Sequence, residues 1–146
     1  MNLTRALNGD LQIARKTLAF DGTANLGEFA NPNVPVFTIT GMVEALLIFG
    51  RTTESFASAG GGTLSLGVTG GLTLFIGNTT ATALTTTAAI WASTTPNAFG
   101  IAAPAALKDI IIMANVVITV GTADVTNGTV DIICYYLPLS LGSGLT

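Results

Sequence analysis

The sequence predicts an all-β fold: a single-domain jelly roll, β-sandwich or barrel of about eight short antiparallel strands. Short runs rich in β-branched and aromatic residues recur along the chain, and glycine, proline or asparagine separates them. No stretch shows the sustained apolar period of a long helix. The chain has 146 residues, which suffices for one domain with its own hydrophobic core.

Both ends of the chain are expected to lie outside this β domain. Residues 1–16 mix charged and amide side chains with isolated leucines, and Asn8-Gly9-Asp10 interrupts a weak helical stripe. We therefore predict an extended N-terminal arm over residues 1–16. Residues 141–146 are rich in glycine and serine and predict a flexible tail, which leaves residues 17–140 for the β domain.

The first part of that domain contains three predicted strands. Residues 17–20 form a short one, and residues 34–40 alternate apolar and polar side chains. Pro35 has no N–H to donate, so this second strand is expected at a sheet edge. Gly41 permits a bend before residues 42–50, where flanking glycines and the shortness of the run favour a strand over a helix.

The middle of the chain contains the clearest two-residue period. In residues 63–69 the apolar side chains expected to point inward are Leu64, Leu66 and Val68. Residues 72–76 predict a strand or one helical turn. Residues 88–92 predict a short strand in which Trp91 anchors the core or an interface.

The most apolar region spans residues 110–139 and predicts a β-hairpin. An apolar run at 110–120 is followed by a polar loop at 121–128, in which Asn127-Gly128 is a turn signal. One face of the second strand is apolar throughout: Val130, Ile132, Cys134 and Tyr136. The other face begins polar and becomes apolar: Asp131, Ile133, Tyr135 and Leu137. This surplus apolar face needs a second sheet with a lid, or a partner chain, to cover it.

The composition argues against several classes of protein. Only 9% of residues are charged, the net charge is −3, and no basic stripe is present to neutralise phosphates, so we expect no nucleic-acid binding. The apolar run at 110–120 is too short for a membrane-spanning helix, and no membrane partner is expected. A chain with so little charge is expected to hide surface in an assembly, which favours a coat-like structural protein over a free enzyme.

Residues suited to catalysis are scarce. The chain lacks histidine, which excludes the common nucleophile–histidine triads and histidine metal ligands. Cys134 is expected to be a small buried hydrophobe. Glu44, inside an apolar strand, is expected to face outward or to pair at an interface, and Asp124 lacks the acid spacing of a calcium loop. The glycine-rich pieces match no phosphate or dinucleotide motif, so we predict no catalytic residue, cofactor or metal site.

Several segments in the same order resemble a group of small proteins encoded by tailed phages and prophages. They are residues 12–17, 35–41, 118–129 and 136–140. Related phage proteins with jelly-roll folds decorate the outside of capsids as cement proteins. The resemblance therefore implies a virion protein, made in the host cytoplasm, that binds the major capsid protein on the capsid exterior. Tyr136-Leu137-Pro138 departs from the group, in which an Arg-Pro pair follows a Trp or similar residue, so no arginine contact is inferred here.

Two sets of residues are candidates for partner binding. The first set is basic and lies on the expected arm, where it is either solvated or laid on an acidic partner surface: Arg5, Arg15 and Lys16. The second set lies on the surplus apolar face and is expected in a homo-oligomer interface: Ile133, Tyr135 and Leu137. A closed homo-oligomer is expected, with a trimer favoured over a dimer.

Three other functions remain open from the sequence. A tail, fibre or head–tail connector protein would have a similar composition. A carbohydrate-binding β-sandwich would normally expose several aromatic residues, whereas this chain has one Trp and two Tyr, all within predicted strands. A small enzyme using paired carboxylates is the least favoured of the three.

Overall fold

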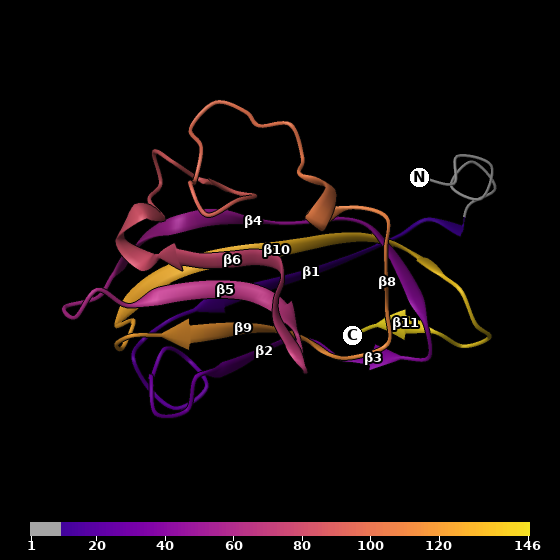
Figure 1. The fold of residues 1–146 in the computed structure, drawn as a ribbon, viewed down its shortest axis with the longest axis horizontal. Helices are drawn as coiled ribbons and strands as arrows, with labels where there is room; N and C mark the ends of the chain where they lie inside the picture. The colour runs from indigo at the N-terminus through magenta and orange to yellow at the C-terminus, as the bar shows by residue number, and fades with distance from the viewer. Residues whose placement is uncertain (1–9) are drawn as a thin grey trace.

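The computed structural model describes residues 10–146, which form two antiparallel sheets packed face to face (Figure 1). The five-stranded sheet has the order β1 (Gln12–Ala19), β10 (Asn127–Pro138), β4 (Val43–Ala57) and β7 (Ile90–Trp91), and β8 (Ile110–Ile112) also pairs with β4. The four-stranded sheet has the order β2 (Asn33–Phe37), β9 (Val116–Gly121), β5 (Thr63–Val68) and β6 (Gly71–Thr80). A small pair joins β3 (Ile39–Thr40) to β11 (Gly144–Leu145), and two 3₁₀ turns are η2 (Ala81–Ala83) and η3 (Ala105–Leu107).

The strands pair in a nested order that identifies a jelly roll. Apart from the short β3–β11 pair, β1 pairs with β10, β2 with β9, β4 with β7 and β8, and β5 with β6. The chain thus folds as one long hairpin of strand pairs that wraps into two sheets, joined within each sheet by β10–β4 and β9–β5. The predicted all-β class is confirmed.

The predicted hairpin over residues 110–139 is wrong. The apolar run at 110–120 divides into β8 and β9, and β9 and β10 belong to different sheets. Both edges of β10 are already paired, one with β1 and the other with β4, so no edge remains for β9. Gly128 serves the core instead of a hairpin turn: its φ is +127°, and a Cβ there would lie 2.4 Å from the Phe56 ring.

The predicted boundaries of the domain also need correction. Residues 12–16 belong to β1 and pair with β10, so they are part of the sheet; residues 1–9 lie outside the described part of the chain. The tail is paired as well, because Gly144–Leu145 forms β11 and Thr38 and Thr146 exchange two backbone hydrogen bonds. Strand pairing uses backbone groups that every residue other than proline carries, so polar or glycine-rich segments can join a sheet edge.

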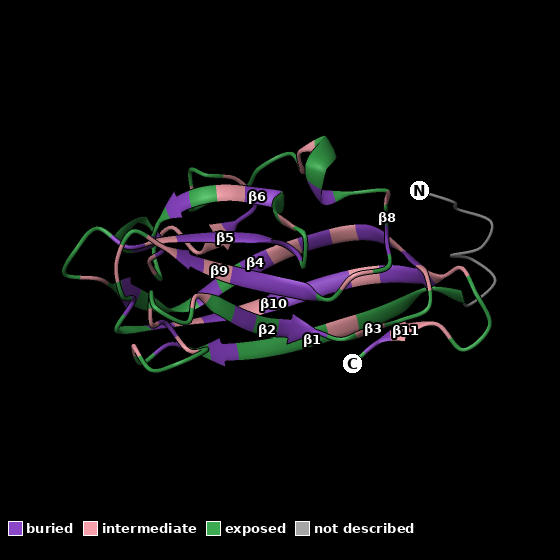
Figure 2. Ribbon diagram, turned by 60° about the horizontal axis from the view of Figure 1, so that its bottom comes forward, coloured by how far each residue is buried: buried purple, intermediate pink, exposed green. Residues whose placement is uncertain are grey.

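The hydrophobic core lies between the two sheets, and Figure 2 shows the buried stretches of their strands. Leu64, Leu66 and Val68 are buried there as predicted. Trp91 is fully buried, and its Nε1–H donates to Thr79 Oγ1 of the other sheet at 3.0 Å. Gly50 lies directly opposite Trp91, and a Cβ at Gly50 would approach the indole to 2.8 Å. The glycine therefore lets the indole lie close against β4.

The remaining strand predictions mostly agree with the structure. Pro35 lies in β2, which pairs only with β9 and is an edge strand, as predicted. Gly41, with φ +67°, occupies the bend before β4. β4 extends to Ala57, beyond the predicted end at residue 50. Its second half is mostly exposed, apart from Thr52 and Phe56, and continues the pairing with β10.

Candidate interaction surface

The outer face of the five-stranded sheet carries three cross-strand rows of side chains. Residues directly opposite each other on antiparallel strands lie on the same face. Across β1, β10 and β4 the rows are Ile13–Tyr135–Leu47, Arg15–Ile133–Phe49 and Thr17–Asp131–Arg51. The outer face is therefore apolar toward β8 and becomes polar toward the opposite end, where Thr17 Oγ1 donates to Asp131 Oδ1 at 2.6 Å.

Burial varies strongly within the apolar part of this face. Ile13 is 52% exposed, whereas Ile133 is only 8% exposed. Tyr135, Leu47 and Phe49 are half-buried. Ile133 is not part of the core cluster between the sheets; it forms an apolar layer on the outer face with Leu47 and Phe49, which pack against that cluster.

A long connection, residues 92–109, supplies part of that layer. It links β7 to β8, and η3 within it contacts both β4 and β6, so it closes one side of the sandwich. Leu107 of η3 is fully buried in the core. A cavity of about 190 Å³ lies between this connection and β4; its lining is Leu47, Phe49, Ile90, Ala92, Ile101, Ala103 and Leu107.

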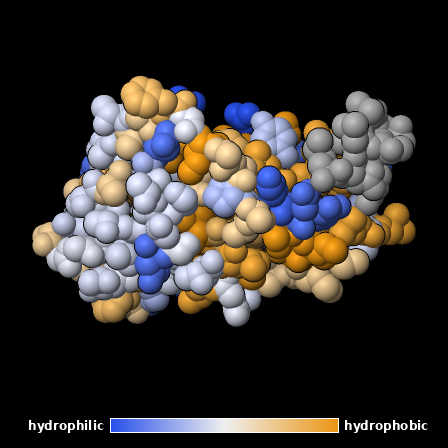
Figure 3. All heavy atoms as spheres, turned by 45° about the horizontal axis from the view of Figure 1, so that its top comes forward, coloured by the Kyte–Doolittle hydropathy of each residue, from blue (hydrophilic) through white to orange (hydrophobic). Residues whose placement is uncertain are grey.

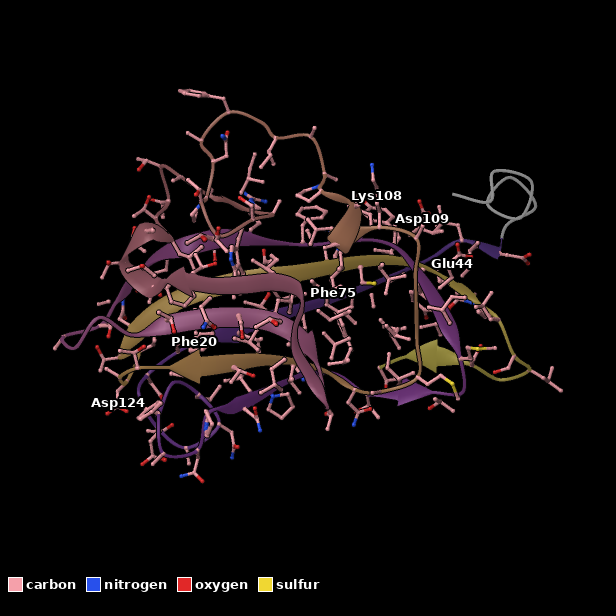
Figure 4. All side chains as sticks on the ribbon, viewed as in Figure 1. Phe20, Glu44, Phe75, Lys108, Asp109 and Asp124 are labelled. Atoms are coloured by element: carbon pink, nitrogen blue, oxygen red, sulfur yellow. The ribbon has the colours of Figure 1, made fainter. Side chains whose placement is uncertain are left out.

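A second hollow of about 320 Å³ lies beside the first and shares Leu47 and Ala103 with it. Within residues 10–146 its lining is Leu11, Leu46, Leu47, Ala103, Lys108 and Tyr135. We call this hollow the Leu47 groove. Among the described residues, Lys108 is the only charged one in this lining, and its side chain projects outward from the end of η3 (Figure 4). The groove is thus apolar with one cation at its rim.

The molecular surface reflects the same division into two ends. On the face drawn in Figure 3, hydrophobic residues gather over the half that carries β8 in Figure 1. The other half is weakly hydrophilic. Large apolar patches on a soluble protein commonly mark interaction sites.

The predicted basic residues do not act as one unit. Arg15 is exposed on the outer face, in the row of Ile133. Lys16 is also exposed, but as the next residue of β1 it points to the opposite face. Arg5 lies outside the described residues. Arg15 and Lys16 are therefore strand residues and not part of an extended arm.

The predicted apolar residues differ in how far they are exposed. Tyr135 lines the Leu47 groove and keeps partial exposure. Leu137, in contrast, is 0% exposed and has no free surface for a partner, which corrects its assignment. The apolar pattern of β10 identified the face, but it contained no information on how far the rest of the chain covers each position.

Sequence reasoning missed the residues that complete the surface. Leu46 and Leu47 of β4 and Ala103 of the long connection form much of the groove. Leu47 and Phe49 alternate with the inward residues of their strand, a two-residue signal that was available in the sequence. The contribution of Ala103 had no comparable signal, because a loop's path over a sheet depends on tertiary contacts.

Three acidic residues of the described chain serve local structure. Hydrogen bonds from the hydroxyl and N–H of Thr23 hold the pKa of Asp21 below its usual value. Asp124 accepts the N–H of Phe29, and Glu54 accepts the hydroxyl of Thr129. Within residues 10–146 no three acids or cysteines gather in a way that could bind a metal ion. No helix of this part is long and apolar enough to cross a membrane.

No protein-family model, curated protein or solved structure matches the chain. The apolar outer face of the five-stranded sheet is therefore the feature of the molecule that bears on its function.

Proposed function

We propose that this chain is a non-enzymatic structural protein of a phage virion that decorates the outside of the capsid. In this role it binds the major capsid protein and other copies of itself, and it stabilises the shell through many contacts. The observation that carries the proposal is the apolar outer face of the five-stranded sheet, with the Leu47 groove at its centre. Such a face needs a partner surface to cover it.

The architecture supports the same role. Jelly rolls with two four- or five-stranded sheets are frequent in viral capsid proteins, although the fold alone does not define a function. The segments that resemble phage proteins include β1 residues 12–17, residues 118–121 of β9 and the two ends of β10. β1 and β10 both belong to the sheet that carries the apolar outer face, although Ile133 and Tyr135 lie between the resembling parts of β10.

The low charge suits a protein that binds a repetitive lattice. Each contact of such a protein is small, and its affinity comes from simultaneous binding of linked copies. Arg15 flanks the apolar rows and offers a cation to an acidic patch on the shell. In this scheme the apolar rows supply contact area between copies and with the shell, and Arg15 supplies orientation.

A rebinding experiment tests the proposal. Purified protein is added to capsids stripped of accessory proteins, and bound protein is quantified and located by electron microscopy. We expect saturable binding at symmetry-related positions of the shell, in a fixed ratio to the major capsid protein. Labelling confined to tails would replace the proposal with a tail or connector function.

Matched variants show which face binds. Tyr135→Ser removes an aromatic side chain from the groove and should weaken attachment. Phe29→Ser removes a 50%-exposed phenylalanine from the loop after β1, and its N–H can still bond to Asp124. Attachment that falls equally in both variants would contradict a role for the outer face.

A further inference from the structure

We propose that the partner of the Leu47 groove is a second copy of this chain, whose Phe99 side chain occupies the groove reciprocally. This inference rests on the proposed function, in which the apolar face is covered by a partner. The ligand of the groove is then an aromatic side chain, and the assembly is a two-fold symmetric dimer.

Phe99 is displayed at the surface on a hydrogen-bonded turn. Its side chain is 101% exposed, so it forgoes all the stabilisation that burial of a large apolar side chain provides. The turn beneath it is ordered: Asn97 Oδ1 accepts the N–H groups of Phe99 and Gly100, both at 2.9 Å. Ile90 and Asn97 also exchange two backbone hydrogen bonds of 2.9 and 3.0 Å. A preorganised turn presents the ring at a low entropic cost of binding.

Both ends of the loop that carries Phe99 are anchored in the core. Trp91 precedes it and Leu107 follows it, and both are fully buried. Residues 93–104 between these anchors contain no charged side chain. An uncharged loop with an aromatic residue displayed on a braced turn is suited to contact with an apolar surface.

The groove is complementary to this ring. A hollow of about 320 Å³ with an apolar lining can accept an aromatic side chain. The cation at its rim, Lys108, adds electrostatic complementarity, because an ammonium group is attracted to the face of an aromatic ring. Inside the groove, polar groups of an occupant would meet leucine and alanine walls that offer them no partners.

The arrangement within one protomer favours a reciprocal pair. Phe99 and Ala103, which lines the groove, are separated by four residues and so by at most about 14 Å. Ring and groove therefore belong to one patch, and a two-fold axis lets each copy donate its ring to the other. A reciprocal contact closes at two copies, which favours a dimer over the trimer expected from the sequence.

A stable dimer needs more buried area than the two phenylalanine rings supply. A phenylalanine buries roughly 150–250 Å², whereas a stable interface buries about 1,600 Å² in total. The two rings alone are too small. The same patch offers Leu11, Ile13 and Ile101, all exposed, to supply further contact around each ring.

Sedimentation velocity over a range of concentrations tests the inference. We expect a dimer for the unaltered chain. Phe99→Ser should raise the dimer dissociation constant at least about 100-fold, since both symmetric sites lose an aromatic side chain whose burial is worth about tenfold or more. Phe29→Ser, at another exposed phenylalanine, should leave the dimer intact.

Groove variants provide the second arm. Leu47→Arg introduces a charge into the groove, and Ala103→Phe fills it without removing a core side chain; both should give monomers with unchanged circular dichroism. Mixing Phe99→Ser with Ala103→Phe restores one of the two sites, so a heterodimer should form with intermediate affinity. A dimer that persists in Phe99→Ser, a wild-type monomer, or a trimer would overturn the inference.

The outcomes separate the inference from the proposed function. A monomer that still saturates stripped capsids would overturn the reciprocal pair and leave the decoration function standing. A dimer that Phe99→Ser dissociates, but that binds no capsid, would support the pair and overturn the function.

Discussion

The two faces of β10 are similar in sequence but differ in what covers them. The inner residues are Val130, Ile132, Cys134 and Tyr136, and all are buried against the opposite sheet. The outer residues range from Asp131 through half-buried Tyr135 to fully buried Leu137. An apolar side chain on the inner face therefore stabilises the fold, whereas Tyr135 on the outer face leaves surface free for a partner.

This difference shows that apolar content alone does not distinguish core from interface. The inner face is covered by a whole sheet, which the nested strand order supplies. The outer face is covered only in part, by the connection of residues 92–109 and its anchor Leu107. Substitutions on the two faces should therefore differ in stability and in assembly.

The largest expected effect is at the centre of the inner face. Ile132→Ala should lower the free energy of unfolding by about 2–5 kcal/mol, because it leaves a cavity in a fully buried site. Urea unfolding monitored by tryptophan fluorescence measures the change. The outer-face substitution Ile13→Ala, at an exposed position, should lower stability by less than about 1 kcal/mol. Equal losses would refute the contrast between the faces.

A smaller loss is expected where a glycine lets Trp91 approach the sheet. Gly50→Ala places a methyl group 2.8 Å from the indole, and the tight core cannot easily yield. We expect about 1–3 kcal/mol of destabilisation and a shifted tryptophan emission. Gly70→Ala is a useful comparison, because its φ of +91° is strained for alanine but no atom lies near. If Gly50→Ala lowers stability without changing the Trp91 emission, a clash between the new methyl group and the indole is contradicted.

The thiol on the inner face should make stability depend on alkaline pH. Burial raises the pKa of Cys134 from 9.0 to about 12. Above pH 9 the unfolded chain loses this proton while the folded chain keeps it, so deprotonation favours the unfolded state. The contribution is complete below pH 9 and declines by about 1.4 kcal/mol per pH unit from there toward pH 12.

Cys134→Ala isolates this contribution from other groups that titrate at high pH. Unfolding free energies of the two proteins, measured from pH 8 to pH 10.5, should converge as the pH rises. A constant difference across that range would contradict a protonated buried thiol.

The smallest expected loss of stability comes from removing a tyrosine hydroxyl, and two neighbouring tyrosines on opposite faces of β10 can be compared. The Tyr136 hydroxyl donates to Gln12 Oε1 at 2.7 Å and accepts the N–H of Leu145 at 3.4 Å. Tyr136→Phe should cost about 1 kcal/mol of stability. Tyr135→Phe should change it by less than about 0.5 kcal/mol, and thermal unfolding distinguishes the two. A larger loss at Tyr135 would mean that its hydroxyl has a structural role.

Much of the fold followed from local patterns. The alternation of Leu64, Leu66 and Val68 placed β5 and its inward face correctly, and Pro35 correctly indicated an edge strand. The predicted hairpin failed because Asn127 and Gly128 begin β10 itself, where the absence of a side chain at Gly128 makes room for Phe56, and the connection from β9 crosses between the two sheets. The arm failed because backbone pairing recruits residues 12–16 whatever their side chains.

The candidate surface was foreseen only in part. Ile133 and Tyr135 were identified from a strand that is apolar on both faces. The structure places them in two neighbouring cross-strand rows of the outer face. Leu47 was missed in a neighbouring strand, and Ala103 in a loop, because their proximity depends on register and on the path of residues 92–109.

The sequence by itself determined that the chain is built from strands and that one of them has more apolar surface than its core needs. Side-chain alternation is a local property, and it acts through the two-residue period of a strand. Only the tertiary structure decided that β9 and β10 separate into two sheets, that Leu137 is covered, and that Tyr135 borders an open groove. These outcomes depend on which strands compete for each edge and face, and that competition is settled by contacts between residues far apart in the chain.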